Sequence, residues 1–354
     1  MDLAGVVTAS GVRSVALVGT AKNVGKTVTM NYLAHELSAR GKSVGLVSSG
    51  RDGETTDSFT GEPKPSVVPP EGSWVATAEG VLGESGGLLQ IADVSERLGL
   101  LGRLVLGRVV ESSPLELVGP QSARELSAVV AKLRSLGADI VLVDGALDRV
   151  AAASPTVTDA CILSTGASSD QNLKVIAHKI ASVVWMWSRP TPRDPRVRAL
   201  AREVLSRGFV AFLDQGVSYT VRPTSYTTCL GFEEEILSRA GDAAFVAVPG
   251  AVSAKFLMEA GSWPERDDFS VIASSAVSVF TTEDLGVPIY VDEEIRLLAI
   301  TVNPVAYRGI SYDPGQMVSA VAREVAQVAR RSLPVFDVVS GETSGKGVAG
   351  VAMG

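Results

Sequence analysis

Short apolar runs alternate with longer stretches of helical periodicity along the first half of the chain. Strands are predicted at 15–18, 43–47, 140–143 and 160–164, and helices at 28–40, 122–136 and 171–187. This alternation is typical of strand, crossover helix, strand units, and hence of a parallel sheet with helices on both faces. We therefore expect an α/β fold with a doubly wound, mostly parallel sheet.

A proline-rich segment at 188–195 interrupts this pattern, with three prolines in eight residues that cannot continue a helix. Beyond it the alternation resumes, with helices predicted at 196–206, 232–240 and 315–331 and strands at 209–213, 244–248, 269–273, 297–302 and 335–339. We predict a first domain over 1–187, a linker at 188–195 and a second α/β domain over 196–354.

The most specific motif follows the first predicted strand, where residues 19–27 read Gly-Thr-Ala-Lys-Asn-Val-Gly-Lys-Thr. Glycines let the backbone approach a polyphosphate closely, and the N-terminus of the next helix favours anions. We expect Lys26 to reach the β- and γ-phosphates and Thr27 to hold Mg²⁺. The residues expected to contact the nucleotide are Gly19, Thr20, Lys22, Asn23, Val24, Gly25, Lys26, Thr27 and Val28. For Lys22 the alternative is a solvated lysine.

Phosphoryl transfer also needs an acidic residue that orients Mg²⁺ from the end of a buried strand near the loop. Asp144 directly follows the apolar run 140–143 and fits that description, so we expect it to be catalytic together with Lys26. The alternative for Asp144 is a helix cap. Asp148 and Arg149 follow it, and they are candidates for substrate or γ-phosphate contact, or for a surface ion pair.

Weaker signals lie at three other places. Asp52 and Asp57 belong to the polar stretch after the second strand, where either could bind Mg²⁺ or simply be solvated; Asp52 lies closer to the strand end. Asn303 ends a strand, and its amide could read a nucleotide base or form an ordinary Asn-Pro turn. Lys255 follows a tight turn and could meet an anion, although turn chemistry explains that segment as well.

Composition narrows the class of protein. The 354 residues are 46% apolar and 20% charged, as in a globular enzyme, and the net charge of −7 argues against a nucleic-acid surface. No apolar run approaches the length of a membrane span, so we expect a cytoplasmic protein that does not contact membranes. The cysteines, Cys161 and Cys229, are expected to be reduced packing residues, and His35 and His178 do not suggest a metal site.

The spacing Gly-x5-Gly-Lys-Thr resembles the dethiobiotin synthetase and cobyrinate amidase branch of P-loop proteins. With the run from Asp144 to Pro155 and the segment Val-Pro-Gly-Ala-Val at 248–252, the chain also resembles the smaller subunit of the reactivating factor for lysine 5,6-aminomutase. This second resemblance implies that Gly25, Lys26, Thr27 and Asp144 hold Mg-ATP. It also implies two partners, a larger ATPase subunit and an adenosylcobalamin-dependent aminomutase whose activity is restored.

Two other functions remain open. A carboxylate-activating ligase of the dethiobiotin synthetase type would use ATP only with a small substrate, but that enzyme has a Glu-Gly-Ala-Gly-Gly-like run where this chain has Asp-Gly-Ala-Leu-Asp at 144–148. A nucleotide-binding regulator would bind ATP without hydrolysing it. The response of ATP turnover to a partner protein or to a small acid separates these functions.

Overall fold

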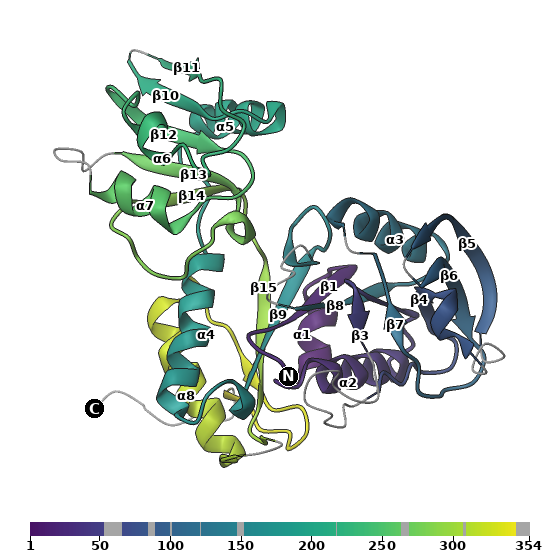
Figure 1. Cartoon of the computed structure of the whole chain (residues 1–354). Helices are drawn as coiled ribbons and strands as arrows, with labels where there is room; N and C mark the ends of the chain where they lie inside the picture. The colour runs from purple at the N-terminus through teal and green to yellow at the C-terminus, as the bar shows by residue number, and fades with distance from the viewer. Residues whose placement is uncertain are drawn as a thin grey trace. The chain divides into compact units, whose positions relative to one another are not determined.

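A computed structural model describes residues 1–52, 66–83, 89–99, 101–120, 122–146, 152–216, 218–262, 269–306 and 309–344. The chain forms two compact units (Figure 1). The first unit comprises Met1–Ala181 and Arg296–Gly354, and the second comprises Ser182–Ile295. The second unit is therefore an insertion into the sequence of the first.

In the first unit, nine strands among the described residues form one sheet in the order β16-β15-β9-β1-β8-β2-β4-β6-β5. Their bounds are β1 Ser14–Gly19, β2 Val44–Ser48, β4 Trp74–Ala78, β5 Leu89–Gly99, β6 Gly102–Val109, β8 Ile140–Ala146, β9 Ala160–Gly166, β15 Leu297–Asn303 and β16 Val335–Phe336. All neighbouring pairs are parallel except β4–β6 and β5–β6. The predicted fold class, a mostly parallel α/β sheet, is confirmed.

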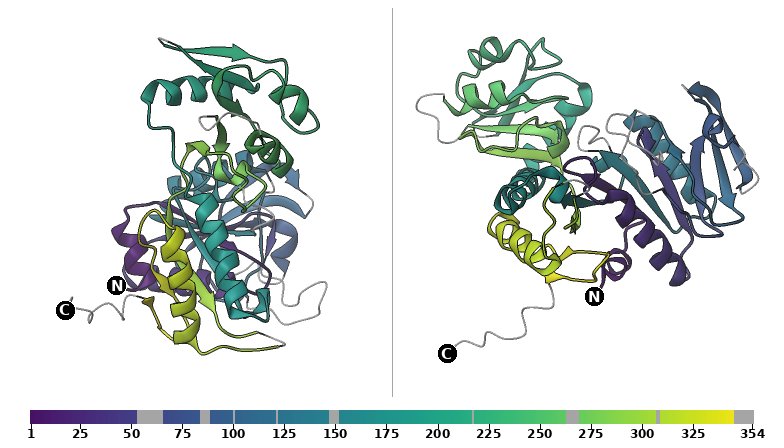
Figure 2. Two further views of the ribbon diagram at one scale, coloured as in Figure 1. Left: turned by 90° about the vertical axis from the view of Figure 1, so that its left-hand side faces the viewer. Right: turned by 60° about the horizontal axis from the view of Figure 1, so that its bottom comes forward.

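Helices cover both faces of this sheet. On one face, α1 (Leu3–Ala9) and α2 (Lys26–Ala39) pack against side chains such as Leu17 and Leu142. On the other face, α3 (Ala123–Ser135) places Leu133 beside Gly45 and Val141. Two further helices, α4 (Leu173–Trp187) and α8 (Pro314–Val328), lie side by side (Figures 1 and 2). The parallel strands are thus buried on both faces, which explains why they read as continuous apolar runs.

The strand register brings the carboxyl ends of the central strands into line. Gly19 of β1 pairs with Ala146 of β8 and with Ser164 of β9. Next to β9, Asn303 of β15 pairs with Gly166. Open parallel sheets bind ligands outside this edge, where helices begin and side chains from distant parts of the sequence meet.

A short two-stranded sheet lies beside this edge. Here β3 (Arg51–Asp52) pairs in antiparallel fashion with β7 (Leu117–Val118). The hydroxyl group of Thr77 accepts from the amide N–H of Val118 at 2.9 Å and donates to the carbonyl oxygen of Glu116 at 2.9 Å. The segment after β2 is therefore attached through β7 to β4.

The second unit has its own five-stranded sheet among the described residues, in the order β11-β10-β12-β13-β14. Its elements are α5 Pro195–Arg207, β10 Ala211–Gln215, β11 Tyr219–Pro223, α6 Glu233–Leu237, β12 Ala243–Val248, α7 Ala254–Gly261, β13 Ser270–Ser275 and β14 Ile289–Glu293. The pairs β10–β11 and β10–β12 are antiparallel, whereas β12, β13 and β14 are parallel. The core beneath α5 contains Val197, Ala201 and Leu213.

The predicted division of the chain differs from the observed one. All of 196–354 was predicted to lie in the second domain, but β15 and β16 complete the first sheet, where β15 pairs with β9. A prediction based on a single linker cannot detect this return. The first boundary lies within α4, slightly before the predicted linker at 188–195, which carries no helix or strand before Pro195.

Most predicted elements are present, with small shifts at their ends. Helix α6 and strand β16 are shorter than expected, and the strands β4, β5, β6, β11 and β14 were not predicted. Strand β5 is largely exposed along its length and lies at the edge of the sheet, so it lacks the apolar run that marks a buried strand. Among the helices that the structure describes, none is long and apolar enough to cross a membrane.

Candidate functional site

The loop that joins β1 to α2 contains two residues with left-handed backbone. Gly25 precedes the helix in a left-handed conformation, with φ of 90°, and Asn23 is also left-handed, with φ of 58°. Left-handed backbone favours Gly and, among other residues, Asn. The amide N–H groups at the start of α2 have no partner within the helix, as at the N-terminus of any helix, and are suited to binding an anion.

Gly19 allows the side chain of Lys26 to pass close to the end of β1. A Cβ atom at position 19 would lie 2.9 Å from Cδ of Lys26 and 2.8 Å from a methyl carbon of Val24. Contacts below 3.0 Å would force these atoms to move. The first glycine of the motif therefore makes room for the side chains of Lys26 and Val24.

The Lys26 ammonium group lies 2.9 Å from a carboxylate oxygen of Asp144 on the adjacent strand β8. The Asp144 side chain is 1% exposed and that of Lys26 is 14% exposed. The amide N–H of Ser49 donates to the carbonyl oxygen of Asp144 at 2.8 Å, which extends the ladder between β2 and β8. Lys26 and Asp144, separated by more than a hundred residues, thus form a partly buried pair at the end of the loop.

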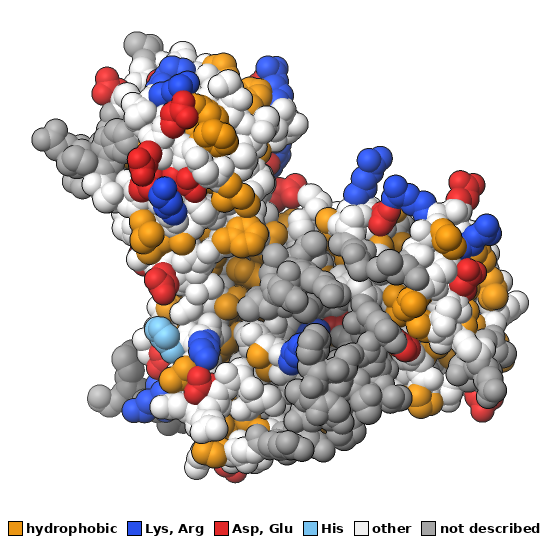
Figure 3. Space-filling model, viewed as in Figure 1, with side chains coloured by type: hydrophobic (Ala, Val, Ile, Leu, Met, Phe, Trp, Pro, Cys, Tyr) orange, Lys and Arg blue, Asp and Glu red, His pale blue; other side chains and the backbone are white. Residues whose placement is uncertain are grey.

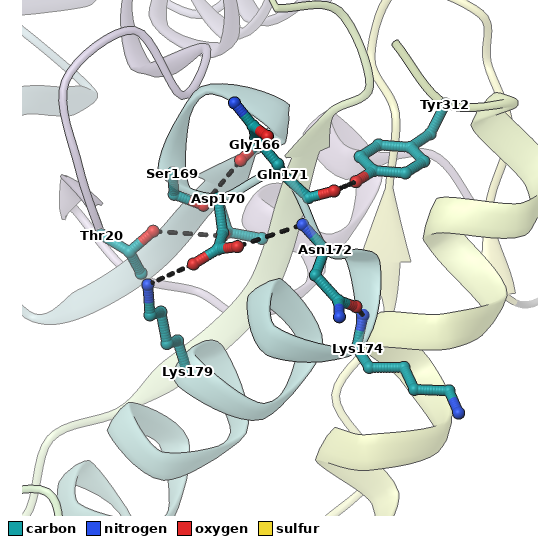
Figure 4. A network of polar contacts seen from close by, with 10 residues as sticks. Thr20, Gly166, Ser169, Asp170, Gln171, Asn172, Lys174, Lys179 and Tyr312 are labelled. Carbon is teal, nitrogen blue, oxygen red and sulfur yellow. Dashed lines mark hydrogen bonds and ion pairs between the residues drawn. The ribbon is translucent and has the colours of Figure 1, made fainter. Parts of the chain in front are cut away.

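Strand β9 supports the loop from the other side. The amide N–H of Thr20 donates to the carbonyl oxygen of Ser164 at 2.8 Å, and the hydroxyl groups of Thr20 and Thr165 lie 3.1 Å apart. Figure 4 shows the connection between β9 and α4, where Asp170 binds Lys179 at 2.9 Å. The Tyr312 hydroxyl group donates to the Gln171 carbonyl oxygen at 2.8 Å, which attaches the segment after β15 to this connection (Figure 4).

Asn303 lies directly against the loop. Its amide nitrogen donates to the carbonyl oxygen of Asn23 at 3.2 Å, and its amide oxygen accepts from the N–H of Val305 at 3.2 Å. A primary amide has two N–H donors and an oxygen with two lone pairs. These two bonds leave one donor and one lone pair for another molecule.

The remaining candidates fall into three groups. Thr27 and Val28 are half-buried in the first turn of α2, Val24 is buried and Lys22 is exposed. Asp52 belongs to β3, but the structure describes only its backbone, while Asp57, Asp148 and Arg149 lie outside the described residues. Lys255 belongs to α7 of the second unit, where its ammonium group lies 3.7 Å from Glu234 and 3.5 Å from Glu259.

Sequence reasoning missed the residues that hold Asn303 and the loop together. Gly166 packs so closely that a Cβ atom there would lie 3.0 Å from the Asn303 carbonyl oxygen and 3.1 Å from Cα of Val24. Ser164 and Thr301 are fully buried polar residues on neighbouring strands. Hydroxyl groups inside otherwise apolar strands were the signal that could have drawn attention to them.

The residues present would suit a magnesium ion held mainly by the phosphates of a nucleotide, if one binds at the loop. Among the described residues, no group of three or more His, Cys, Asp or Glu side chains could hold a metal. Mg²⁺ is usually bound through one or two carboxylates plus substrate phosphates. A buried aspartate and a threonine in the first turn of α2 fit this mode, with Asp144 and Thr27 as the protein oxygens.

Charge is mixed on the surface that Figure 3 shows. Basic and acidic side chains are interspersed over both units on this face, and the described residues there form no stripe of one sign. In the second unit, a shallow hollow of about 520 Å³ is lined by side chains of both signs, including Glu233, Glu234 and Lys255.

Comparisons with known proteins identify no family. No protein-family model matches the chain, and no curated protein matches it. A solved structure of the signal recognition particle receptor FtsY from Elizabethkingia anophelis aligns with 17% identity and a TM-score of 0.25. The alignment covers 48% of this chain and 46% of the receptor chain, less than half of each. A likeness at this level does not establish a shared fold or function.

Proposed function

We propose that the chain binds Mg-ATP at residues 19–28 and hydrolyses it. The observation that carries this proposal is the pair formed by Lys26 and the buried Asp144, 2.9 Å apart, at the start of a helix that follows a glycine loop. In a bound complex, the Lys26 ammonium group would contact the β- and γ-phosphates, and Thr27 and Asp144 would hold Mg²⁺. When bound, the metal would neutralise charge on the phosphates while the terminal phosphoryl group is transferred to water and ADP is released.

Asn303 supports a nucleotide rather than a simple anion as the ligand. Its amide lies at the loop and keeps one donor and one acceptor for another group. Adenine presents an adjacent acceptor and donor at N7 and N6, which an asparagine amide can bind through both of its groups. We therefore propose adenine as the base.

The finer proposal concerns what hydrolysis drives. From the sequence resemblance, we propose that this chain is the ATPase subunit of a reactivating factor for an adenosylcobalamin-dependent aminomutase, acting with a larger partner subunit. Such an ATPase can act on its target only if its ATP-bound and ADP-bound states bind that target with different affinities. The ATPase rate of the chain should therefore rise when the inactivated mutase and the partner subunit are present.

The first test compares nucleotide binding and turnover in the wild type, Lys26→Ala and Asp144→Asn. Lys26→Ala should weaken ATP binding by roughly tenfold or more because it removes a charge-assisted contact. Asp144→Asn should preserve ATP binding without metal and abolish Mg²⁺-dependent hydrolysis. Lys132→Ala, which removes a 2.7 Å surface pair with Asp93, is the matched control and should change neither.

Removing either charge of the Lys26–Asp144 pair also lowers stability. Unfolding curves recorded in parallel therefore separate a loss of binding or turnover in a folded variant from a loss caused by unfolding. A folded wild type that binds no ATP would refute the nucleotide proposal. Binding without turnover, even with the mutase and partner present, would favour a regulator. Turnover that appears only with a small carboxylate would favour a ligase. Stimulated turnover with recovered mutase activity would support the reactivating factor.

A further inference from the structure

Three buried hydroxyl groups connect the loop helix to the two strands beside it. Thr29 on α2 lies 3.1 Å from Thr301 on β15, oxygen to oxygen, and Thr301 lies 2.8 Å from Ser164 on β9. Thr29 also donates to the carbonyl oxygen of Gly25 at 3.0 Å. The exposed fractions of Thr29, Ser164 and Thr301 are 1%, 0% and 2%. We call these three residues the hydroxyl chain.

The hydroxyl chain contacts the loop at both of its ends and carries Asn303 on the strand between them. At one end, Thr29 contacts Gly25, which begins α2 in the left-handed conformation. At the other end, Ser164 accepts the amide N–H of Thr20 through its carbonyl oxygen. Between them, Thr301 lies two residues before Asn303 on the same strand, so its position along β15 sets that of the Asn303 amide.

Hydroxyl groups are an unusual choice for this place in the core. Valine has the shape of threonine, and an apolar set would avoid burying three polar groups. Hydrogen bonds, however, are directional, and they fix the register of the strands and helix that carry them. Three hydroxyl protons suffice for the three contacts, so every group in the chain can be satisfied.

We propose that Thr29, Thr301 and Ser164 are positioning residues that hold the Asn303 amide at a fixed place relative to the phosphate-binding loop, and thereby set the preference of the site for adenine over guanine. This inference rests on the proposed function, since it concerns the base of the same nucleotide. A shift of β15 relative to α2 would separate the amide from a base whose phosphates stay on the loop. Base discrimination should then be lost while phosphate binding remains.

The test measures dissociation constants for ATP, GTP and inorganic tripolyphosphate by calorimetry in the wild type and Thr301→Val. We expect the wild type to prefer ATP over GTP, and Thr301→Val to reduce that preference by about tenfold. Affinity for tripolyphosphate should stay within about threefold, because the loop itself keeps its contacts. Thr301→Ser, which restores the hydroxyl group, should recover most of the preference.

Two other variants complete the test: one replaces Thr301→Val if that variant does not fold, and the other is a control. Ser164→Ala removes the far end of the chain with less change in volume and should reduce the same preference if Thr301→Val does not fold. Thr158→Val is the matched control: Thr158 is 3% exposed, its hydroxyl group donates to the Ala152 carbonyl oxygen at 2.7 Å, and it lies two residues before the amino end of β9, whereas Ser164 and Thr165 near the carboxyl end of β9 contact the loop. It should lower stability without changing the preference.

Failure of this inference can be told apart from failure of the proposed function. A wild type that binds neither tripolyphosphate nor nucleotide overturns both. A wild type that binds ATP and GTP equally, or a Thr301→Val variant that keeps the wild-type preference, overturns the positioning role alone. Equal weakening of all three ligands in Thr301→Val, without recovery in Thr301→Ser, would also overturn it, because that pattern belongs to a general structural defect.

Discussion

Gly25 packs against Asn303 so closely that a Cβ atom at position 25 would lie 3.0 Å from Cβ of the asparagine. Gly25 also has φ of 90°, a conformation that residues with a side chain rarely adopt. The position is therefore restricted twice, by its backbone and by a residue from the far end of the sequence. The glycine that precedes α2 also determines how near β15 can come.

Gly25→Ala should consequently weaken nucleotide binding in addition to lowering the stability of the fold. We expect a loss of about 1–2 kcal/mol in the free energy of unfolding from the left-handed backbone, plus displacement of Asn303 from the loop. Gly41→Ala is the matched control, since Gly41 has φ of 75° and nothing within 4 Å of its would-be Cβ. Urea unfolding and ATP binding should show a similar loss of stability in both variants but weaker binding only in Gly25→Ala.

Gly119, which directly follows β7, provides a test of how β7 is attached to the end of β2. A Cβ atom there would lie 1.7 Å from the carbonyl oxygen of Ser48, and the Gly119 amide donates to the Gly50 carbonyl oxygen at 2.6 Å. Neither backbone atom can move without disturbing β2. Gly119→Ala should therefore lower the free energy of unfolding by about 3 kcal/mol, at the upper end of overpacking costs.

The control for that measurement is Gly315→Ala in the first turn of α8. Its would-be Cβ lies 3.4 Å from the nearest atom, in ordinary contact, and alanine favours helix. Thermal unfolding should show no loss in this variant. A Gly119→Ala protein as stable as the wild type would mean that β7 does not lie against the end of β2.

Much of the first unit can be predicted from the sequence because strands that are buried on both faces of the sheet consist of continuous apolar residues. Strand β1 is buried at all six positions, and the loop after it is recognisable from residue types and spacing alone. Asp144 was identified by the same logic, as the residue that follows an apolar strand. Local signals therefore predicted which residues meet at the loop between β1 and α2.

The remainder depends on contacts between distant segments, which no local pattern contains. Asn303 was a candidate only because it ends a strand; its contact with Asn23 requires β15 to return to the first sheet after the whole second unit. The single proline-rich segment suggested one boundary, so this return was missed. Thr29, Ser164 and Thr301 were missed for a related reason, since their hydroxyl groups meet only when α2 packs against β9 and β15.

The two cysteines offer a check on burial in each unit. Burial raises the pKa of the Cys161 thiol well above its ordinary range, and it also raises the pKa of Cys229. Both residues are fully buried, and Cys161 lies on β9 in the interior of the large sheet. Because the thiolate is the reactive form, both should resist a thiol reagent near pH 8.

We expect labelling with an aromatic disulfide to modify neither cysteine quickly in the native protein and both in urea. Cys229 should react first, because it lies in a segment without regular structure, which can open locally, whereas Cys161 needs much of the sheet to open. Peptide mapping by mass spectrometry assigns the order. Rapid labelling of Cys161 in the native state would contradict the position of β9.

Glu233 joins α6 to α7 in the second unit. Its carboxylate accepts from the Ser253 hydroxyl group at 3.1 Å, and Ser253 in turn caps α7 by accepting the amide N–H of Phe256 at 3.1 Å. Burial alone would raise the pKa of Glu233, but the N–H groups of Glu233 and Gly231, together with Ser253 and Lys255, outweigh it. The pKa therefore lies below its ordinary value of 4.5.

A lowered carboxyl pKa in the folded state stabilises the fold above 4.5, and this contribution disappears as the pH falls through the folded value. Glu233→Gln should therefore destabilise the second unit by about 1–3 kcal/mol at neutral pH and much less at a pH below the folded value. The neighbouring Glu234, whose side chain is 82% exposed, supplies the control Glu234→Gln, which should change little at either pH. Hydrogen exchange at the amides of α6 and α7, recorded at both pH values, measures the difference. An equal loss of protection in Glu233→Gln at both pH values would mean that the charge of Glu233 does not hold these helices together.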